Sequence, residues 1–497
     1  MSNKNLKSKS VGVAAHSDPH HKGITLIALI ITIIVMMILV AVSVTVALDG
    51  GLFGTAKDAA SKTQIEAEKE MLLSAVVGAI GTDAKVDLNK IQLPEGFIKT
   101  SEGMIESPNG NRFTVSEDGG ISEVGYKTQI TGLGTGVTLV PYEELTGELK
   151  IAADEGKIVA VLKETKDGIE YQAVIPAGFE VSTKDGENTI SGGLVVSDAN
   201  ENEFVWVPCT TDESNASGLI QYAQDKQYND GTIASKQWEY KNYGDWTDEG
   251  GNSQSVTKYG GFYVGRYEAG IPSNAPFYAN TDGAEYVITN HIRNTTAYIP
   301  VSKPNNPSWN WTSQVNAKTV SEKMYSNSTS VESTLIDSYA WDTIVNWMES
   351  KNAGIATNGI DYGNYLSTSI SLTDALYATY VYNYTTGTWV SFPSKYQKGT
   401  IEIPARSGGE TTLYEIATGS TEETKVLNIY DMSGNMWEWT TEVGNHDAGI
   451  SATQYAVVRG GSFHGNGEFS PLSYRGGDLT SAARHYNFGF RVVLYVK

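Results

Sequence analysis

The sequence predicts an α+β protein that begins with one membrane-spanning helix and continues into a large, loop-rich domain. Residues 24–48 read ITLIALIITIIVMMILVAVSVTVAL without a charged side chain, which exceeds the roughly 20 apolar residues that cross a bilayer as a helix. The whole chain of 497 residues contains 51 Gly and 28 Tyr, a composition typical of turns and short strands. Two helical patterns, at residues 316–325 and 334–350, are predicted to form core helices.

The charges around the apolar run predict its orientation. Lys4, Lys7, Lys9 and Lys22 precede the run, against a single acid, Asp18. Because cytoplasmic flanks carry the excess of Lys and Arg, the N-terminus is expected in the cytoplasm and the C-terminal domain outside the cell. A cleaved secretory signal has a shorter apolar core, of about 7 to 15 residues, and a small-residue exit site. The membrane is therefore an expected partner, crossed in a single pass.

The composition narrows the possible functions. Its 57 acidic and 36 basic residues give a formal charge of -21, so a phosphate backbone is repelled and no nucleic-acid partner is expected. The single cysteine, Cys209, excludes an intrachain disulfide and a paired-thiol centre. The sequence has no HExxH, GxSxG or P-loop motif, and His291, His446, His464 and His485 are scattered. No catalytic residue is expected, and the chain is predicted not to be an enzyme.

The segment HKGITLIALIITII, residues 21–34, resembles the leader junction of type IV prepilins, where Lys and Gly precede a long apolar helix. The resemblance implies a leader peptide at residues 1–23, cleavage after Gly23 by a prepilin peptidase, and N-methylation of Ile24. It makes prepilin peptidase and the type IV pilus components expected partners.

The same resemblance implies that the transmembrane helix of residues 24–48 continues outside the membrane through residues 49–82. Residues 55–80 are rich in helix formers and become apolar toward their end, so that end is expected to pack on a globular domain. Ala28 departs from the pilin pattern, because pilins carry there a Glu that pairs with a neighbour's terminal amine during assembly. An uncleaved anchor and a minor pilus component stay open as alternatives.

The remaining chain divides into two parts that differ in their pattern of apolar and turn-forming residues. Residues 83–173 alternate short apolar runs with turn signals, which predicts small β elements and linker. Residues 174–497 form the main domain, in which six segments stand out: NEFVWVP, GGFYVGRYEAG, TLIDSYAWDTIVNWM, VLNIYDMSGNMWEWTTE, VVRGGSF and GFRVVLYVK. Together they resemble the formylglycine-generating, sulfatase-modifying family, which implies a C-type-lectin-like domain.

The family's enzymes oxidise a substrate cysteine with two cysteines near the C-terminus that hold copper. No cysteine follows Cys209 in this chain, and Cys209 itself is expected to be a small buried residue of the first strand segment. No copper is expected. A formylglycine-generating-type enzyme is retained only as an alternative, because activity does not follow from fold.

The block DMSGNMWEW has a metal interpretation. In the family, the matching segment binds calcium through one side-chain oxygen, two backbone carbonyls and a Glu. Here those positions are Asp431, the carbonyls of Gly434 and Met436, and Glu438. All-oxygen ligation with carboxylates suits calcium. In the other interpretation, both acids cap turns while Trp437 and Trp439 fill the core.

Residues 460–488 read GGSFHGNGEFSPLSYRGGDLTSAARHYNF, a mixture of aromatic, polar and small residues typical of a paratope. The segment resembles the variable region of diversity-generating retroelement target proteins, which share the lectin-like fold and are rewritten at template adenines. The resemblance implies a variable region at residues 462–488. Its candidate ligand-contact residues are His464, Asn466, Phe469, Tyr474, Gly476, Asp478, Thr480, Arg484, His485, Tyr486 and Asn487.

These features together predict a surface-displayed receptor or adhesin whose C-terminal surface, diversified by a retroelement, binds an unknown extracellular protein or glycan. A minor pilin or structural surface component is the first alternative. The formylglycine-generating-type enzyme is the second.

Overall fold

The computed structural model describes most of the chain after residue 51. The described residues are 52–79, 85–87, 90–99, 104–109, 111–116, 119–127, 129–212, 214, 216–222, 252–275, 294–393, 396–407, 409–444 and 455–497. The chain divides into two compact units, residues 1–56 and 57–497. The leader, its cleavage site and the apolar run lie outside the described residues. Within the described part of the chain, no helix is long and apolar enough to span a membrane.

Helix α2 (Leu52–Val77) lies in the segment expected to continue the transmembrane helix. Its buried Leu72 and Val76 share a small core with Phe97, Ile105 and Phe113, because residues four apart on a helix lie on one face. The partner of the helix is an antiparallel sheet of order β1-β2-β3-β4. Its strands are β1 (Ile98–Lys99), β2 (Ile105–Glu106), β3 (Arg112–Val115) and β4 (Ile121–Val124).

A second, three-stranded sheet has the order β5-β6-β7. Its elements are β5 (Val137–Leu139), α3 (Gly147–Asp154), β6 (Ile158–Lys166) and β7 (Ile169–Pro176). Asp167 and Gly168 join β6 to β7 with φ of 53° and 79°, the conformation that a tight two-residue hairpin requires at both positions. Strand β7 runs across the boundary expected at residues 173 and 174, so this sheet joins the small β region to the main domain.

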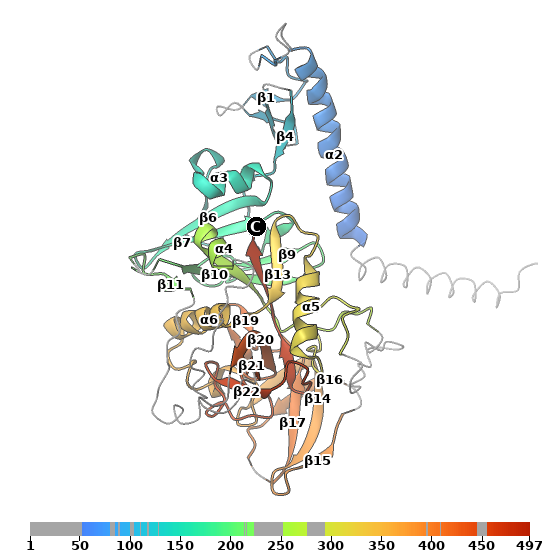
Figure 1. Ribbon diagram of the computed structural model, residues 1–497, viewed down its shortest axis with the longest axis vertical. Coiled ribbons are helices and arrows are strands. Elements are labelled where there is room, and N and C mark those ends of the chain that lie inside the picture. The colour runs from blue at the N-terminus through green and yellow to red at the C-terminus, as the bar shows by residue number, and fades with distance from the viewer. Residues whose placement is uncertain are drawn as a thin grey trace, which may run out of the picture. The chain divides into compact units, whose positions relative to one another are not determined.

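The central sheet of the main domain has seven strands in the order β13-β24-β12-β10-β9-β8, with β11 paired to β10. The C-terminal strand lies inside this sheet, between β12 and β13 (Figure 1). The strands are β8 (Phe179–Val181), β9 (Val195–Asp198), β10 (Glu203–Thr210), β11 (Ile220–Gln221), β12 (Gly261–Gly265), β13 (Val331–Leu335) and β24 (Val492–Val496).

The two core helices predicted from periodicity are confirmed, with shifted starts. The main-domain helices are α4 (Asn252–Tyr259), α5 (Gln314–Met324) and α6 (Ser338–Lys351). Trp341, Ile344 and Met348 of α6 are buried. The helix begins only after Asp337, whose carboxylate accepts a hydrogen bond from Ala340 N at 2.6 Å, because such a cap satisfies a free N–H of the first turn.

The C-terminal part consists of three further sheets, which complete the expected mixture of helices and short strands. In the first, β14 pairs with β15, β16 and β17. In the third, of order β22-β21-β20-β23, β20 and β23 run parallel. The strands are β14 (Ile370–Asn383), β15 (Thr388–Ser391), β16 (Gln397–Ile403), β17 (Glu410–Ile416), β18 (Lys425–Val426), β19 (Ile429–Tyr430), β20 (Trp437–Gly444), β21 (Tyr455–Arg459), β22 (Arg475–Leu479) and β23 (Phe488–Phe490).

Candidate ligand-binding surface

The hairpin between β14 and β15 is closed by a turn that the local sequence specifies. The side-chain oxygen of Asn383 accepts hydrogen bonds from the backbone N–H of Thr385 and of Thr386, at 3.0 and 3.1 Å. Gly387 closes the turn with a φ of 68°, in the left-handed region that glycine adopts without strain. The turn fixes the register in which Tyr382 lies opposite Trp389.

Aromatic side chains gather on one face of this hairpin. Tyr380 and Tyr382 alternate along β14, and alternate residues of a strand point to the same face. Tyr384 follows the last residue of the strand, and its ring lies 4.8 Å from that of Tyr382. Trp389 packs on Tyr382 with ring centroids 4.8 Å apart, and Phe392 follows it at 4.6 Å. The hairpin therefore presents a continuous group of rings.

The C-terminal segment meets the hairpin at this group. The ring of His464 lies 4.8 Å from that of Tyr382 and 5.3 Å from that of Trp389. Tyr486 packs edge-on against Trp389 at 4.7 Å. Two stretches that lie far apart in the sequence thus share one cluster.

The cluster has an outer layer and a floor. In the outer layer Phe392 is exposed and the other rings are half-buried; we call this layer the aromatic surface, and it consists of Tyr382, Tyr384, Trp389, Phe392 and His464. Below it lie the buried rings of Tyr380, Phe463 and Tyr486. Rings that are packed from below and open above lose little conformational freedom when a ligand binds.

A buried carboxylate holds the floor in place. Glu415 of β17 is fully buried and accepts a hydrogen bond from the Tyr380 hydroxyl at 2.5 Å. The Tyr396 hydroxyl also donates to Glu415, and the Asn310 amide donates at 3.2 Å. Three donors compensate the loss of water around this group, so the floor is fixed to the domain core.

His464 is held neutral within the aromatic surface. Its Nδ1 lies 2.5 Å from the Tyr486 hydroxyl, and the Tyr384 hydroxyl donates to its backbone carbonyl at 3.2 Å. Burial lowers the pKa of His464 to about 4, and the nearby His485 contributes in the same direction. At neutral pH the imidazole therefore carries no charge.

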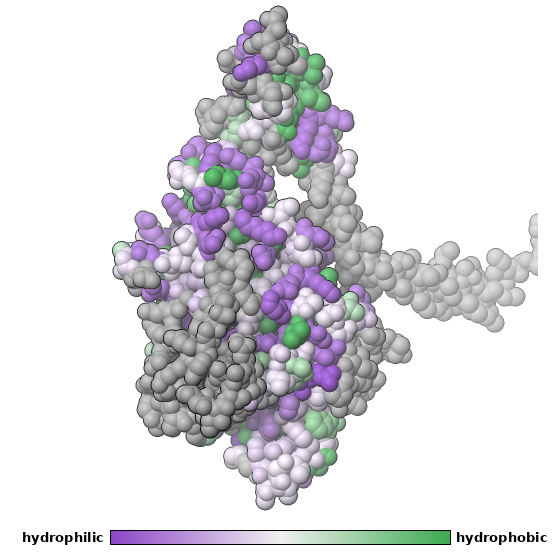
Figure 2. Space-filling model, in the orientation of Figure 1, coloured by the Kyte–Doolittle hydropathy of each residue, from purple (hydrophilic) through white to green (hydrophobic). Residues whose placement is uncertain are grey.

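The part of the hairpin nearest its turn contains no acidic or basic residue. Residues 380–393 read YVYNYTTGTWVSFP, with no Asp, Glu, Lys or Arg, in a chain where these types make up 19% of residues. In Figure 2 the end of the molecule that carries β15 is coloured in pale shades of intermediate hydropathy, in contrast to the purple around α3. The surface is therefore aromatic and hydroxyl-rich rather than charged.

The eleven predicted contact residues differ in how far they are exposed to solvent. Phe469, Thr480, Arg484 and His485 are exposed, and His464, Asn466, Tyr474 and Gly476 are half-buried. Tyr486 and Asn487 are buried, with 4% and 6% of their surface exposed. Nothing is described for the side chain of Asp478.

Tyr486 and Asn487 support the surface from beneath instead of standing on it. The ring of Tyr486 lies between His464 and His485, with centroids 6.0 and 4.9 Å away. Asn487 donates to Ser462 Oγ at 3.0 Å and its Oδ1 lies 3.0 Å from His485 Nδ1. These contacts bring His464, His485, Tyr486 and Asn487 together.

The other predicted residues make separate contacts. Tyr474 packs against Trp437, with ring centroids 5.7 Å apart. The side chain of Asn466 accepts a hydrogen bond from Glu468 N at 2.9 Å, so it shapes its own turn. A Cβ at Gly476 would lie 2.9 Å from Val458 Cγ2, a distance that requires displacement. Exchange at residue 476 is therefore more restricted than at the exposed positions.

Sequence reasoning missed four members of the aromatic surface: Tyr382, Tyr384, Trp389 and Phe392. A signal was present in the uncharged stretch of residues 380–393, where aromatic residues alternate with Thr and Ser in an acidic chain. Its place next to residues 463–486 depends on tertiary structure.

Ion pairs with buried acids hold the chain on both sides of the first part of the predicted variable region. Arg459 Nη2 lies 2.7 Å from Asp342 Oδ1, and Arg475 Nε lies 3.0 Å from Glu442 Oε1. Arg475 also reaches Asp342 at 2.5 Å, so one acid binds both arginines. The first part of the predicted variable region therefore runs between two arginines that are tied to the same acid.

The expected calcium ligands differ in what they offer. Asp431 is fully buried; its Oδ2 accepts from Thr418 Oγ1 and Gly419 N at 2.9 and 2.8 Å, whereas its Oδ1 has no hydrogen-bond partner. Both oxygens of Glu438 accept from Arg491, at 2.6 to 3.1 Å. Asp431 thus fits a cation, while Glu438 is engaged by an arginine.

Burial raises the pKa of both acids. It also raises the pKa of Glu268, where the charges of Asp431 and Glu438 add to the effect. Three buried acids near one arginine favour uptake of a proton by one of them. The described residues contain no group of three or more His, Cys, Asp or Glu arranged to hold a metal ion.

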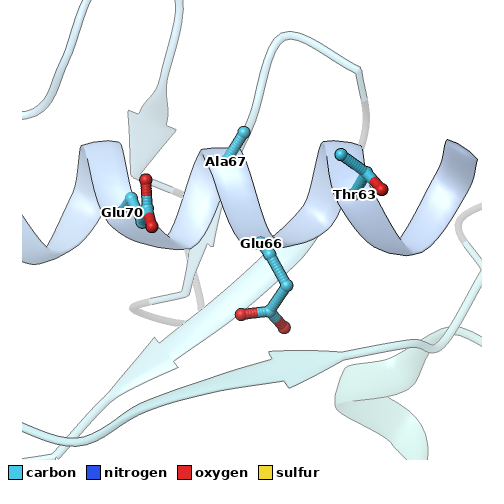
Figure 3. Close-up of a pocket in the computed structure, with 4 residues that line it drawn as sticks. All are labelled: Thr63, Glu66, Ala67 and Glu70. Carbon is cyan, nitrogen blue, oxygen red and sulfur yellow. The ribbon is translucent and has the colours of Figure 1, made fainter.

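Two other features lack the geometry of a reaction centre. Cys209 of β10 is fully buried, and burial raises its thiol pKa, so it is neither accessible nor ionised. A hollow of about 430 Å³ runs along α2 (Figure 3) and has Thr63, Glu66, Ala67 and Glu70 as its described lining residues. All four come from one helix, and Glu66 is paired with Lys69 at 2.9 Å.

One region of the chain matches a known protein family. Residues 372–496 match the Sulfatase-modifying factor enzyme 1-like domain. The matched region begins in β14 and ends in β24, so it contains the aromatic surface and the candidate calcium residues. The resemblance predicted for residues 174–497 is thus confirmed over its C-terminal part. No curated protein matches the chain.

Solved structures give weaker likenesses. The crystal structure of CarF is 13% identical, with a TM-score of 0.28, and the match covers 48% of this chain and 87% of that one. Treponema denticola variable protein 1 is 13% identical, with a TM-score of 0.17 and coverages of 67% and 98%. The Major Tropism Determinant P3c variant is 11% identical, with a TM-score of 0.25 and coverages of 80% and 93%. With scores this far below 0.5, these likenesses carry no argument about this chain.

Proposed function

We propose that the chain is a surface-displayed ligand-binding protein, a receptor or adhesin, that holds its ligand on the aromatic surface. The observation that carries this proposal is the two-layer ring cluster. Its outer rings are partly exposed, and its floor is fixed by Glu415. Aromatic side chains supply large contact areas at low entropic cost. A contiguous group of apolar rings that stays accessible to solvent marks an interaction site.

The test is cell binding by labelled full chain, purified in mild detergent, across a panel of bacterial and animal cells. Trp389→Ala should reduce binding at least tenfold, because Trp389 contacts both the hairpin and the C-terminal segment. Ile151→Ser is the matched control, since Ile151 is 50% exposed on α3. Equal binding by the two variants would refute the proposal.

A non-enzymatic role is part of the proposal. The single thiol is buried, and the formylglycine reaction requires an accessible cysteine pair. The full chain should therefore give no aldehyde when incubated with a CxPxR-type peptide, copper and oxygen. Detectable formylglycine would favour the enzyme instead.

Diversification of residues 462–488 is a further part of the proposal. Exposed positions such as Phe469, Thr480 and Arg484 can be exchanged at a cost of usually no more than about 0.5 kcal/mol. Deep sequencing of a clonal population should find variation there and not at Gly476 or Asn487. A uniform population, without a template copy beside the gene, would remove this part.

Membrane display also remains a proposal. It rests on the apolar run of residues 24–48 and the lysines before it. Terminal sequencing should give a mature chain that starts at Ile24, and Gly23→Ala should block the cleavage. A mature chain that starts at Met1 would leave an uncleaved anchor.

A minor pilin is the second candidate function, and one observation favours it. Helix α2 packs on the β1–β4 sheet through Leu72 and Val76, so the segment behind the predicted anchor is a helix with its own small domain. Recovery of the protein in sheared filaments would support this role. Its absence from filaments, with intact surface display, would leave the receptor.

A further inference from the structure

We infer that the aromatic surface binds an uncharged glycan, an oligosaccharide without carboxylate or sulfate groups. This inference rests on the proposed function and names its ligand class.

The first reason is the lack of charged residues in the segments that supply the described rings. Residues 380–393, 463–467 and 485–488, which supply the cluster, contain no Asp, Glu, Lys or Arg, and His464 is neutral at neutral pH. An ionic ligand would lose water on this face without gaining a counter-charge. The net charge of -21 also disfavours acidic ligands.

One cation beside the hairpin is turned inward. Arg406 interacts electrostatically with Tyr384, but its guanidinium donates to the backbone carbonyls of Thr412 and Tyr365, at 2.8 and 3.3 Å. It also stacks on Tyr414, 5.0 Å from the ring centroid. Arg406 is thus used within the fold and does not make the face attractive to anions.

The chemistry of the face matches that of a sugar ring. A pyranose has an apolar C–H face, which packs on aromatic rings, and a rim of hydroxyls. Trp389 and Phe392 supply adjacent rings, tilted by 39°. The exposed hydroxyls of Thr386 and Thr388 lie 2.7 Å apart, and each hydroxyl can both donate and accept. Rings and hydroxyls are therefore side by side on one hairpin.

The extent of the face favours a short oligosaccharide over a protein. Stable protein interfaces bury about 800 Å² per partner over roughly 20 to 30 residues, and Arg is enriched in them. Among the rings of the aromatic surface, Phe392 is the strongly exposed one, with 45% of its surface accessible. The remaining rings are half-buried and form a limited platform.

The experiment is binding of labelled full chain, in mild detergent, to an array of neutral, sialylated and sulfated oligosaccharides. Binding to at least one neutral oligosaccharide is expected, with a loss of tenfold or more in Trp389→Ala. Phe392→Ala, at an exposed position, should lose about threefold to tenfold, and Ile151→Ser should bind like the unchanged chain. Trp389→Phe, which keeps a ring, should retain part of the binding and so separates lost contact from lost folding.

Periodate-treated and protease-treated cells provide the second arm. Cell binding that depends on Trp389 and is lost after periodate supports the inference. Binding that depends on Trp389 but is lost only after protease, or an array signal confined to sialylated or sulfated glycans, overturns the glycan class and leaves the proposed function intact. Binding that does not depend on Trp389, or no binding in either arm, overturns both.

Discussion

Two neighbouring parts of the C-terminal region are stabilised by different interactions. One is the framework of buried ion pairs, and the other is the aromatic surface. The framework relies on charges without contact with water: Arg491 and Glu438 are both fully buried and 2.6 Å apart. The aromatic surface contains no Asp, Glu, Lys or Arg and gains its order from ring contacts. A buried ion pair costs desolvation of both partners but tolerates only one geometry, whereas neutral rings can be replaced one at a time.

This difference separates the residues that set the fold from those that are free to serve binding. RGGS and GFR, the two framework motifs, each contribute one buried arginine, Arg459 and Arg491. Between them lie the exposed residues Phe469, Thr480 and Arg484. The region can therefore change its exposed side chains while the arginines hold the backbone.

The largest expected effect is on the framework. Arg491→Met should lower the free energy of unfolding by about 3 to 5 kcal/mol, because Glu438 would be left buried and unpaired. Arg484→Met, at an exposed position in the same segment, should change it by no more than about 0.5 kcal/mol. Urea denaturation of the full chain measures both. Similar losses in the two variants would erase the distinction between framework and surface.

Calcium should stabilise the framework without touching the aromatic surface. The unused Oδ1 of buried Asp431 motivates this expectation. A ligand that binds only the folded state adds about 2.7 kcal/mol at one hundred times its dissociation constant. The thermal midpoint should rise in millimolar calcium, and the rise should vanish in Asp431→Asn together with Glu438→Gln. An identical midpoint in chelator and in calcium would assign these acids to packing alone.

Two tyrosines two residues apart provide a matched pair. Tyr380→Phe removes a donor to buried Glu415 and should cost about 1 to 3 kcal/mol. Tyr382→Phe, in the half-buried outer layer, should cost less than about 0.5 kcal/mol. Chemical denaturation compares them directly. A larger loss in Tyr382→Phe would reverse the assignment of floor and outer layer.

The smallest expected effect is the pH dependence at His464. Its pKa is about 4 in the folded protein and about 6.5 when unfolded, so the unfolded chain takes up the proton first as the pH falls. The stability that the neutral ring contributes is complete above about pH 6.5 and is lost on the way to pH 4. Partial exposure limits this loss to about 1 kcal/mol.

His464→Gln should remove this part of the pH dependence, since glutamine stays neutral over the whole range. Nuclear magnetic resonance titration of the imidazole gives the pKa itself. A titration midpoint near pH 6.5 would show that the His464 ring is solvated and does not belong to a desolvated aromatic layer.

Part of this structure follows from local sequence. Trp341, Ile344 and Met348 recur at helical spacing and form the buried face of α6, because periodicity reports which side of a helix meets the core. The helix start did not follow from periodicity: residues 334–335 complete β13, and the Asp337 cap decides where the helix begins. His464 was predicted at the site because its segment lacks apolar periodicity and mixes paratope residue types.

Local sequence patterns were sufficient to predict the α+β class, the two core helices and the resemblance of the C-terminal region to a known domain. The single cysteine was sufficient to argue against paired-thiol chemistry. Tertiary packing selects the side chains that share the aromatic surface, because pairing of β14 with β15 and packing on Tyr486 bring Trp389 beside His464. It also decided that Tyr486 and Asn487 lie below that surface. A local sequence pattern predicts which face of one helix or strand is apolar, whereas the burial of a side chain depends on which other elements pack against that face.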